Sequence, residues 1–170
     1  MAEPRFFCDD HLWRLARWLR AAGIDTAWER AIEDGLLVER ARAEERTVLT
    51  LDRGIAARRN VDVRLLPSHD PVEQLRFLCE AYGLDPLARA FTRCPMCNGV
   101  LTEAAPDQVE VPERVRSCCD RFWQCDGCGR TYWHGDHVRH MRARFETIRG
   151  GDAGRPPGPT SPERPSRPAR

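Results

Sequence analysis

Residues 5–23, RFFCDDHLWRLARWLRAAG, contain a short apolar strand, a pair of acids and an amphipathic helix in direct succession. Residues 5–8 predict a buried strand that stops at the aspartate pair 9–10, where a carboxylate can cap the next helix. Between residues 12 and 22, apolar side chains recur at helical spacing and arginines occupy the opposite side. Gly23 then ends the helix as a C-terminal cap. The segment therefore predicts a β-strand that leads directly into an α-helix.

The same alternation of strands and helices continues as far as residue 91. We expect further strands at residues 24–28, 47–51 and 61–66, and further helices at 34–45, 71–82 and 85–91. Strands and helices that alternate in this way form a parallel sheet with right-handed crossovers and helices on both faces. The expected fold class is therefore α/β, with residues 1–91 as its domain.

Four cysteines in two Cys-x-x-Cys motifs follow this region: Cys94, Cys97, Cys125 and Cys128. In a chain that shows no secretion signal, paired motifs of this kind indicate metal binding rather than disulfides. Each motif places two thiolates on one tight turn, so four sulfurs can surround one Zn²⁺ ion and leave no open coordination position. The alternative is four unrelated thiols. Residues 92–149 therefore predict a small ribbon with structural zinc, a hairpin arm between the motifs and a basic helix at the end.

Two further sets of side chains near these motifs are candidate metal ligands. Cys118 and Cys119 are adjacent, so their side chains point apart, and we interpret them as non-ligands that can oxidise. His134, His137 and His140 share one helix face, which would suit either a second metal or a solvated surface that contacts phosphate. We favour the second interpretation because no carboxylate or cysteine partner has a matching spacing.

The composition limits the classes of partner and the location. The formal net charge is only +1, so no overall basic field indicates nucleic acid, although all 27 basic residues are arginine. Arginine suits bidentate phosphate contacts, but codon bias gives the same inventory. No apolar run approaches the roughly 20 residues of a membrane span, and no signal-peptide pattern is present. We therefore expect a cytoplasmic protein without a membrane partner, with a disordered tail at residues 150–170, which are rich in Pro, Gly, Ser and Arg.

Aspartates follow the predicted strands at the edge where parallel sheets bind ligands. Asp9 follows the first strand, Asp34 opens the helix after the second, and Asp52 follows the third, while Asp70 lies after the fourth. Carboxylates gathered there would repel one another without a hard cation, so they predict a site for Mg²⁺ or Mn²⁺. The alternative for Asp34 and Asp70 is helix capping, and Asp70 begins a capping box with proline at the first helical position.

Several motifs occur in an order that resembles a known family, the Mut7-C ribonuclease domain, which is a PIN-like nuclease fold followed by a zinc ribbon. The resemblance covers nearly all of residues 5–148. It is carried by FFCD (6–9), LARWLR (15–20), GIDT (23–26), VLTLDR (48–53), CPMCNG (94–99) and YWHGDH (132–137).

The resemblance implies cleavage of single-stranded RNA at a metal site made by Asp9, Asp34 and Asp52, with Asp70 as a further candidate. One or two hard cations there would bind the scissile phosphate and lower the pKa of a bound water. Flanking phosphates along the RNA would contact five arginines: Arg17, Arg20, Arg53, Arg139 and Arg142.

Three positions depart from the family pattern, namely Trp13, Leu51 and His134. Trp13 could crowd the turn between strand and helix, or it could stack on a base. Two other classes of function remain open. A nucleic-acid-binding or adaptor module with the same fold would not need its acids to converge. A toxin nuclease with a cognate antitoxin is the weaker alternative, since such toxins usually lack a zinc ribbon.

Overall fold

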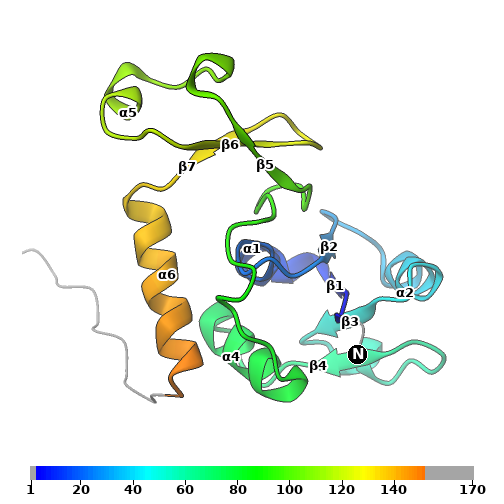
Figure 1. The fold of residues 1–170 in the computed structure, drawn as a ribbon. Coiled ribbons are helices and arrows are strands. Elements are labelled where there is room, and N and C mark those ends of the chain that lie inside the picture. The colour runs from blue at the N-terminus through cyan, green and yellow to red at the C-terminus, as the bar shows by residue number, and fades with distance from the viewer. Residues whose placement is uncertain (1–2, 152–170) are drawn as a thin grey trace, which may run out of the picture.

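The computed structural model of the chain describes residues 3–151, so the predicted disordered tail lies almost wholly outside the described residues. Two sheets are present in this part of the chain (Figure 1). The first is parallel, with strand order β2-β1-β3-β4. Its strands are β1 (Phe6–Cys8), β2 (Thr26–Trp28), β3 (Thr47–Thr50) and β4 (Val63–Leu65).

Helices cover both faces of this sheet. Alternate strand residues point to opposite sides, and both sides carry apolar residues that the helices bury. Phe6 and Cys8 of β1 pack with α1 (Trp13–Ala21) and α4 (Pro71–Tyr82) in one cluster of buried residues. Phe7 packs on the other face with α2 (Asp34–Ala43) and α3 (Arg53–Ala56). A short 3-10 turn, η1 (Asp10–Leu12), joins β1 to α1. The predicted α/β class, with a parallel sheet between helices, is confirmed.

The chain between residues 85 and 91 differs from the expected helix. Asp85 accepts a hydrogen bond from the Leu87 amide at 2.9 Å, and only isolated turns follow. Phe91 adopts a positive φ of 64°, and its amide donates to the Ala21 carbonyl at 2.7 Å. Docking of this segment onto the end of α1 therefore replaces the helical hydrogen bonds, and the prediction of a helix is wrong.

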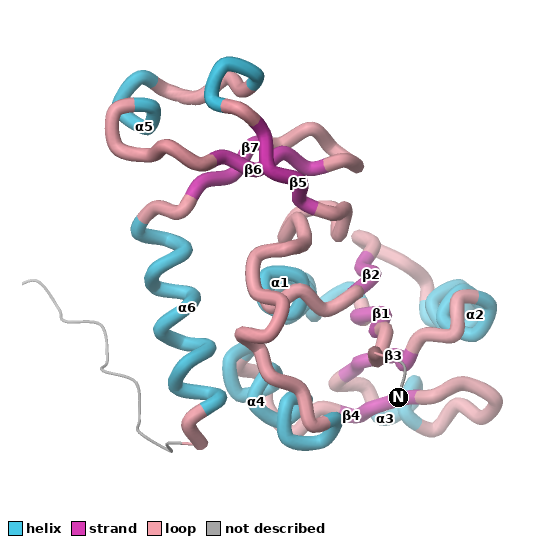
Figure 2. Tube along the Cα trace, viewed as in Figure 1, coloured by secondary structure: helices cyan, strands magenta, loops and turns pink. Residues whose placement is uncertain are grey.

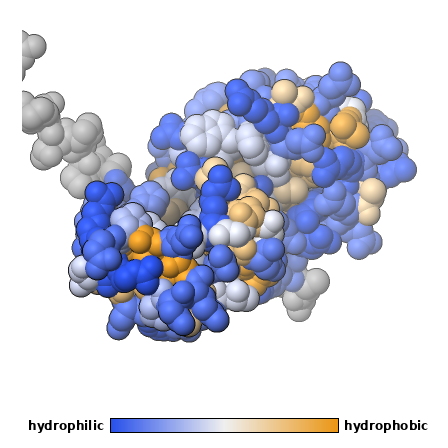
Figure 3. All heavy atoms as spheres, turned by 90° about the horizontal axis from the view of Figure 1, so that it is seen from above, coloured by the Kyte–Doolittle hydropathy of each residue, from blue (hydrophilic) through white to orange (hydrophobic). Residues whose placement is uncertain are grey.

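The second sheet is antiparallel and lies above the first in Figure 1. It contains β5 (Leu101–Ala104), β6 (Phe122–Cys125) and β7 (Thr131–Trp133) in that order. The arm that joins β5 to β6 holds η2 (Pro106–Gln108), α5 (Glu113–Arg116) and a small core of Val109, Val115 and Phe122. Seen from the ribbon side, the surface is mostly hydrophilic, with apolar side chains in small patches (Figure 3).

The last helix, α6 (Asp136–Arg149), runs from the ribbon back to the first sheet and lies beside α4 (Figures 1 and 2). Its Phe145 and Ile148 join the buried cluster that contains α1 and α4. The Phe145 ring meets that of Trp18 edge-on, with centroids 5.6 Å apart. The ribbon is thus joined to the α/β region at both of its ends. No helix within residues 3–151 is long and apolar enough to cross a membrane.

Candidate functional site

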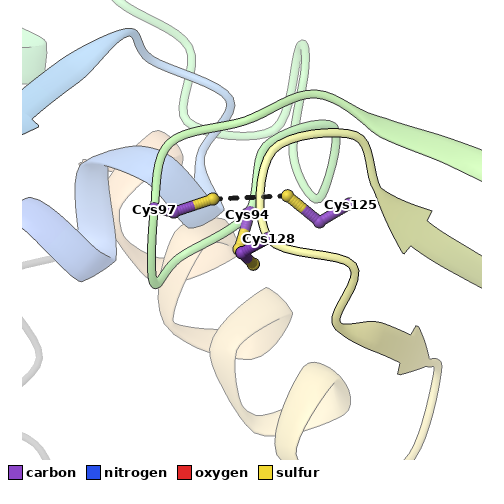
Figure 4. Close-up of side chains that lie close together, drawn as sticks. All are labelled: Cys94, Cys97, Cys125 and Cys128. Atoms are coloured by element: carbon purple, nitrogen blue, oxygen red, sulfur yellow. Dashed lines mark hydrogen bonds between the residues drawn. The ribbon is translucent and has the colours of Figure 1, made fainter.

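The four cysteines of the two motifs form one compact group (Figure 4). Their sulfurs all lie within 4.8 Å of one another, with Sγ–Sγ separations of 3.7 Å for Cys94 and Cys128 and 3.3 Å for Cys97 and Cys125. Four thiolates at about 2.3 Å from a tetrahedral zinc ion would be separated by about 3.8 Å. The donor set and its spacing therefore fit a metal such as zinc.

Close approach of the two motifs depends on Gly99. A Cβ atom at this position would lie 2.8 Å from the Cys125 sulfur and 2.6 Å from a carboxylate oxygen of Asp126. Asn98 and Gly129 supply the positive φ angles of the two turns, at 72° and 71°. The local sequence around each cysteine pair is thus what permits the sulfurs to converge.

The other candidate ligands lie outside this group. Within the described residues, no further set of three histidines, cysteines or carboxylates brings its ligand atoms within 4.8 Å of one another. The sulfurs of Cys118 and Cys119, just after α5, lie 3.6 Å apart, so the expectation that these side chains point apart is wrong. His134 lies between β7 and α6, so the expectation that the three histidines share one helix face is wrong, and its ring stacks on Trp123 with centroids 4.3 Å apart. Partial burial, with the nearby charges of Arg142 and Arg121, lowers the pKa of His134 below its usual range.

The first cysteine turn is bound to the α/β region through Arg20. This side chain is only 3% exposed, and its guanidinium donates to the carbonyls of Thr26 and Met96, each at 2.8 Å. A weaker bond reaches the Pro95 carbonyl at 3.4 Å. The expectation that Arg20 holds an RNA phosphate is therefore wrong, because the ribbon covers this side of α1 and occupies its donors.

A second polar contact between the same two regions centres on Asp25. Its carboxylate accepts hydrogen bonds from Arg46 and from the Asn98 side chain, both at 2.8 Å, and from Arg5 at 3.1 Å. Asn98 also accepts from the Thr26 amide at 3.1 Å. Burial raises the pKa of Asp25, but these hydrogen bonds outweigh burial and hold the pKa well below its usual range.

Three of the four predicted aspartates, Asp9, Asp34 and Asp52, line one cavity of about 420 Å³ near the ends of β1 and β3. Asp9 is 8% exposed and accepts a hydrogen bond from the Thr50 hydroxyl at 2.9 Å. Asp34 and Asp52 are exposed. Asp34 makes no capping bond, since Glu33 occupies the N-cap position of α2, so the capping alternative for Asp34 does not apply.

The three carboxylates share the cavity without forming a tight cluster. Asp52 also caps α3, since it accepts from the amides of Gly54 and Ile55. In the described structure, no three ligand atoms of the cavity's acids and histidines lie within 4.8 Å of one another. In this arrangement, one ion could therefore not contact all three aspartates directly. Mg²⁺ commonly binds one or two carboxylates and keeps several waters. This donor set suits such a hydrated ion.

Asp70 does not line the cavity, although its neighbours His69 and Pro71 do. Its carboxylate accepts from the amides of Val72 and Glu73, at 2.8 and 2.9 Å, and caps α4. Asp70 is therefore the N-cap residue of α4, but the capping box is not completed, because the Asp70 amide donates to the Ser68 hydroxyl at 3.1 Å and not to Glu73. The structure gives no support to the placement of Asp70 in the acidic site.

Other cavity residues were not predicted, namely His11, Arg14, His69 and Gln74. Gln74 is 2% exposed and donates to the Ser68 carbonyl at 2.8 Å. His11 and His69 are within two residues of the predicted aspartates, so their proximity in the sequence was the signal that could have identified them. Arg14 lies about one helical turn before Arg17 on the same arginine-rich face. Helical spacing alone therefore does not show which of the two lines the cavity.

The remaining predicted arginines occupy different positions around the molecule. Arg17 lines a second cavity, of about 390 Å³, between α1 and the ribbon. Arg53 is exposed at the start of α3, directly after Asp52. On α6, Arg139 pairs with Asp136, and the Arg142 guanidinium lies 5.4 Å from the Phe91 ring centroid. These four remain candidates for RNA contact.

Comparison with known families supports the arrangement of a parallel α/β region followed by a four-cysteine ribbon. The model of the Mut7-C RNAse domain matches residues 4–145, which is most of the chain. No curated protein and no solved structure gives a significant match. The match covers both the acidic cavity and the cysteine group, and it confirms the resemblance seen in the sequence motifs. The chain belongs to the Mut7-C RNAse domain family.

Proposed function

We propose that this protein is a metal-dependent ribonuclease that cleaves single-stranded RNA at the cavity lined by Asp9, Asp34 and Asp52. The observation that carries the proposal is that three separate segments bring carboxylates to one cavity near the carboxyl ends of parallel strands. Membership of an RNase domain family supports a nuclease-like role.

Each aspartate has a different environment, and this suggests a division of roles. Asp9 is buried and oriented by Thr50, so it would anchor Mg²⁺ or Mn²⁺ in a fixed position. Asp34 and Asp52 are exposed and would hold the ion directly or through its waters. The bound ion would supply charge neutralisation at the scissile phosphate and a water of lowered pKa.

The side chains around these acids would position the RNA. Arg14, which is exposed at the rim, would pair with a phosphate oxygen beside the scissile bond. His11 and His69 are also exposed at this rim and can donate hydrogen bonds to phosphate. The RNA backbone carries a negative charge at every nucleotide, so these side-chain contacts would fix the path of the RNA through the cavity.

The four cysteines would hold structural zinc in the ribbon. Four thiolates leave no open coordination position, so the ion would stabilise the fold and take no part in cleavage. Because the site needs reduced cysteines, it also supports the proposed cytoplasmic location.

Cleavage of a labelled single-stranded RNA, with Mn²⁺, with Mg²⁺ and with EDTA, tests the proposal. We expect the wild-type protein to cut only with a divalent ion, and Asp9→Asn to be inactive. The matched control is Asp70→Asn, which lies outside the cavity and still caps α4, since asparagine is also a good N-cap residue. Equal activity of Asp9→Asn and wild type would contradict the assignment of the site.

A non-catalytic RNA-binding or adaptor module is the second candidate. It is favoured by the finding that the ligand atoms of the three aspartates do not all lie within 4.8 Å of one another in the described structure, and by the capping bonds of Asp52. RNA binding with no cleavage in either Mn²⁺ or Mg²⁺ would support this second function. Cleavage that needs both the ion and Asp9 would exclude it.

A further inference from the structure

The cavity between α1 and the ribbon is unlike the acidic one. Aromatic rings from both regions form its walls, including Trp13 and Trp18 of α1, Trp123 of β6 and Trp133 of β7. Its volume is about 390 Å³, within the range of ligand pockets. We call this cavity the aromatic cleft.

We propose that the aromatic cleft binds an unpaired base of the RNA strand whose backbone passes through the acidic cavity. This proposal rests on the proposed function, and it assigns to the ribbon the selection of single-stranded substrate. The occupant is inferred from the aromatic lining with its exposed Trp13 ring, from the charge of the lining and from the residue that the two cavities share.

The cleft has one exposed ring, that of Trp13, and the tryptophans opposite it are partly buried. Trp13 is 46% exposed, and the guanidinium carbons of Arg14 and Arg17 each lie 6.0 Å from its ring centroid. Across the cleft, Trp123 and His134 stack with an interplanar angle of 18°. Bases stack on aromatic side chains and on arginine planes, and this combination is typical of sites that bind single strands.

The charge of the lining complements a polyanion. Three arginines, Arg14, Arg17 and Arg93, line the cleft, and none of its lining residues in the described structure is acidic. Arg93 already pairs with Asp25, but an apolar peptide would fit the rings and leave Arg14 and Arg17 without an anionic partner. A nucleotide supplies both a flat apolar face and a phosphate, so it matches the whole lining.

The two cavities are connected through Arg14, which lines both of them. A strand that crosses Arg14 can therefore present a phosphate to the acidic cavity and a neighbouring base to the aromatic cleft. A base held in a duplex is already stacked and paired, so it cannot enter the cleft without being extruded. Selection for unpaired RNA follows from this geometry.

Equilibrium binding of a fluorescent octamer of uridine to the full chain tests the proposal. Binding is measured in the Asp9→Asn background without added Mg²⁺ or Mn²⁺, so that cleavage does not interfere. Loss of one stacking ring should raise Kd about tenfold in Trp13→Ala, the size expected for one stacked base. The matched control is Leu36→Ala on α2, since Leu36 is 45% exposed and lines neither cavity. We expect no change in its Kd.

A second ring and a duplex competitor complete the test. Trp123→Ala should weaken binding similarly and Trp123→Phe should restore it, with zinc content and circular dichroism as checks on folding. A blunt RNA duplex of equal length should compete at least about tenfold less well than the single strand. Unchanged Kd values in both tryptophan variants, or equal competition by the duplex, would overturn the proposal. Tryptophan-dependent binding by a protein that cleaves in no metal would refute the ribonuclease and leave the cleft as a base-binding site.

Discussion

Replacement of Arg20 by methionine should weaken the contact between the ribbon and the α/β region without removing an acid or an aromatic ring from either cavity. The guanidinium is buried and donates to carbonyls on both sides of the interface, those of Thr26 and Met96. Methionine keeps much of the apolar stem but removes every donor. The carbonyls would then be left without their partners in an interface that water enters poorly.

The size of the effect can be worked out from the hydrogen bonds. A hydrogen bond to a charged group contributes about 1.5–3 kcal/mol, and two such bonds have a length of 2.8 Å in this structure. The bond to the Pro95 carbonyl is 3.4 Å long and adds little. The free energy of unfolding should therefore fall by about 3–6 kcal/mol. With a urea dependence of about 2 kcal/mol per molar, the midpoint falls by about 1.5–3 M.

Urea unfolding followed by tryptophan fluorescence measures this change. Arg17→Met is the matched control, since Arg17 is exposed on the same helix. Its midpoint should stay within about 0.3 M of the wild type, as expected for a surface substitution. Release of metal to a chelator should also be faster in Arg20→Met, because the first cysteine turn loses its anchor. Equal midpoints for the two variants would refute the role given to Arg20.

Three further predictions concern the cap, the zinc and the acid contact. Asp70→Ala should lower Tm by about 2–4 °C through loss of about 1 kcal/mol of capping, with cleavage retained in the RNA assay. Cys125→Ser should lower bound zinc, measured by atomic absorption, and unfold the ribbon, while cleavage of short RNA partly persists; unchanged zinc would contradict the ligand assignment. The depressed pKa of Asp25 contributes stability above its unfolded pKa of about 3.9, and this contribution is lost as pH falls through and below that value. Urea midpoints from pH 6 to about pH 3 should therefore fall less steeply in Asp25→Asn.

The main elements of the fold could be predicted because each strand carries its own local signal. Phe6 and Phe7 are adjacent and both fully buried, which requires a strand covered on both faces. The turns at residues 85–91 could not be predicted in the same way. Their conformation depends on the contact between Phe91 and the end of α1, which no local pattern records. The return of α6 to the first core has the same origin, since the helix pattern gives an apolar stripe but does not say what covers it.

The candidate site also contains both residues whose position the sequence predicted and a residue that it misplaced. Spacing alone was sufficient to group the four cysteines, since two short motifs leave few other arrangements. Position after a strand was sufficient to bring Asp9, Asp34 and Asp52 to one cavity. Arg20 was misplaced because an arginine opposite the apolar face of a helix is normally solvated, whereas here a distant segment covers that face.

The anchors of the ribbon and the proposed path of the RNA are linked by α1. Arg20 near the end of this helix holds the first cysteine turn, while Trp13 and Arg14 at its beginning face the two cavities. On the proposed function, a zinc ion held by the four cysteines would act at a distance from the cleavage site, because it would shape the turn that Arg20 holds and so fix the ribbon rings relative to the acids. On this view, loss of zinc would affect long single strands more than short ones, since only long strands need both cavities at once.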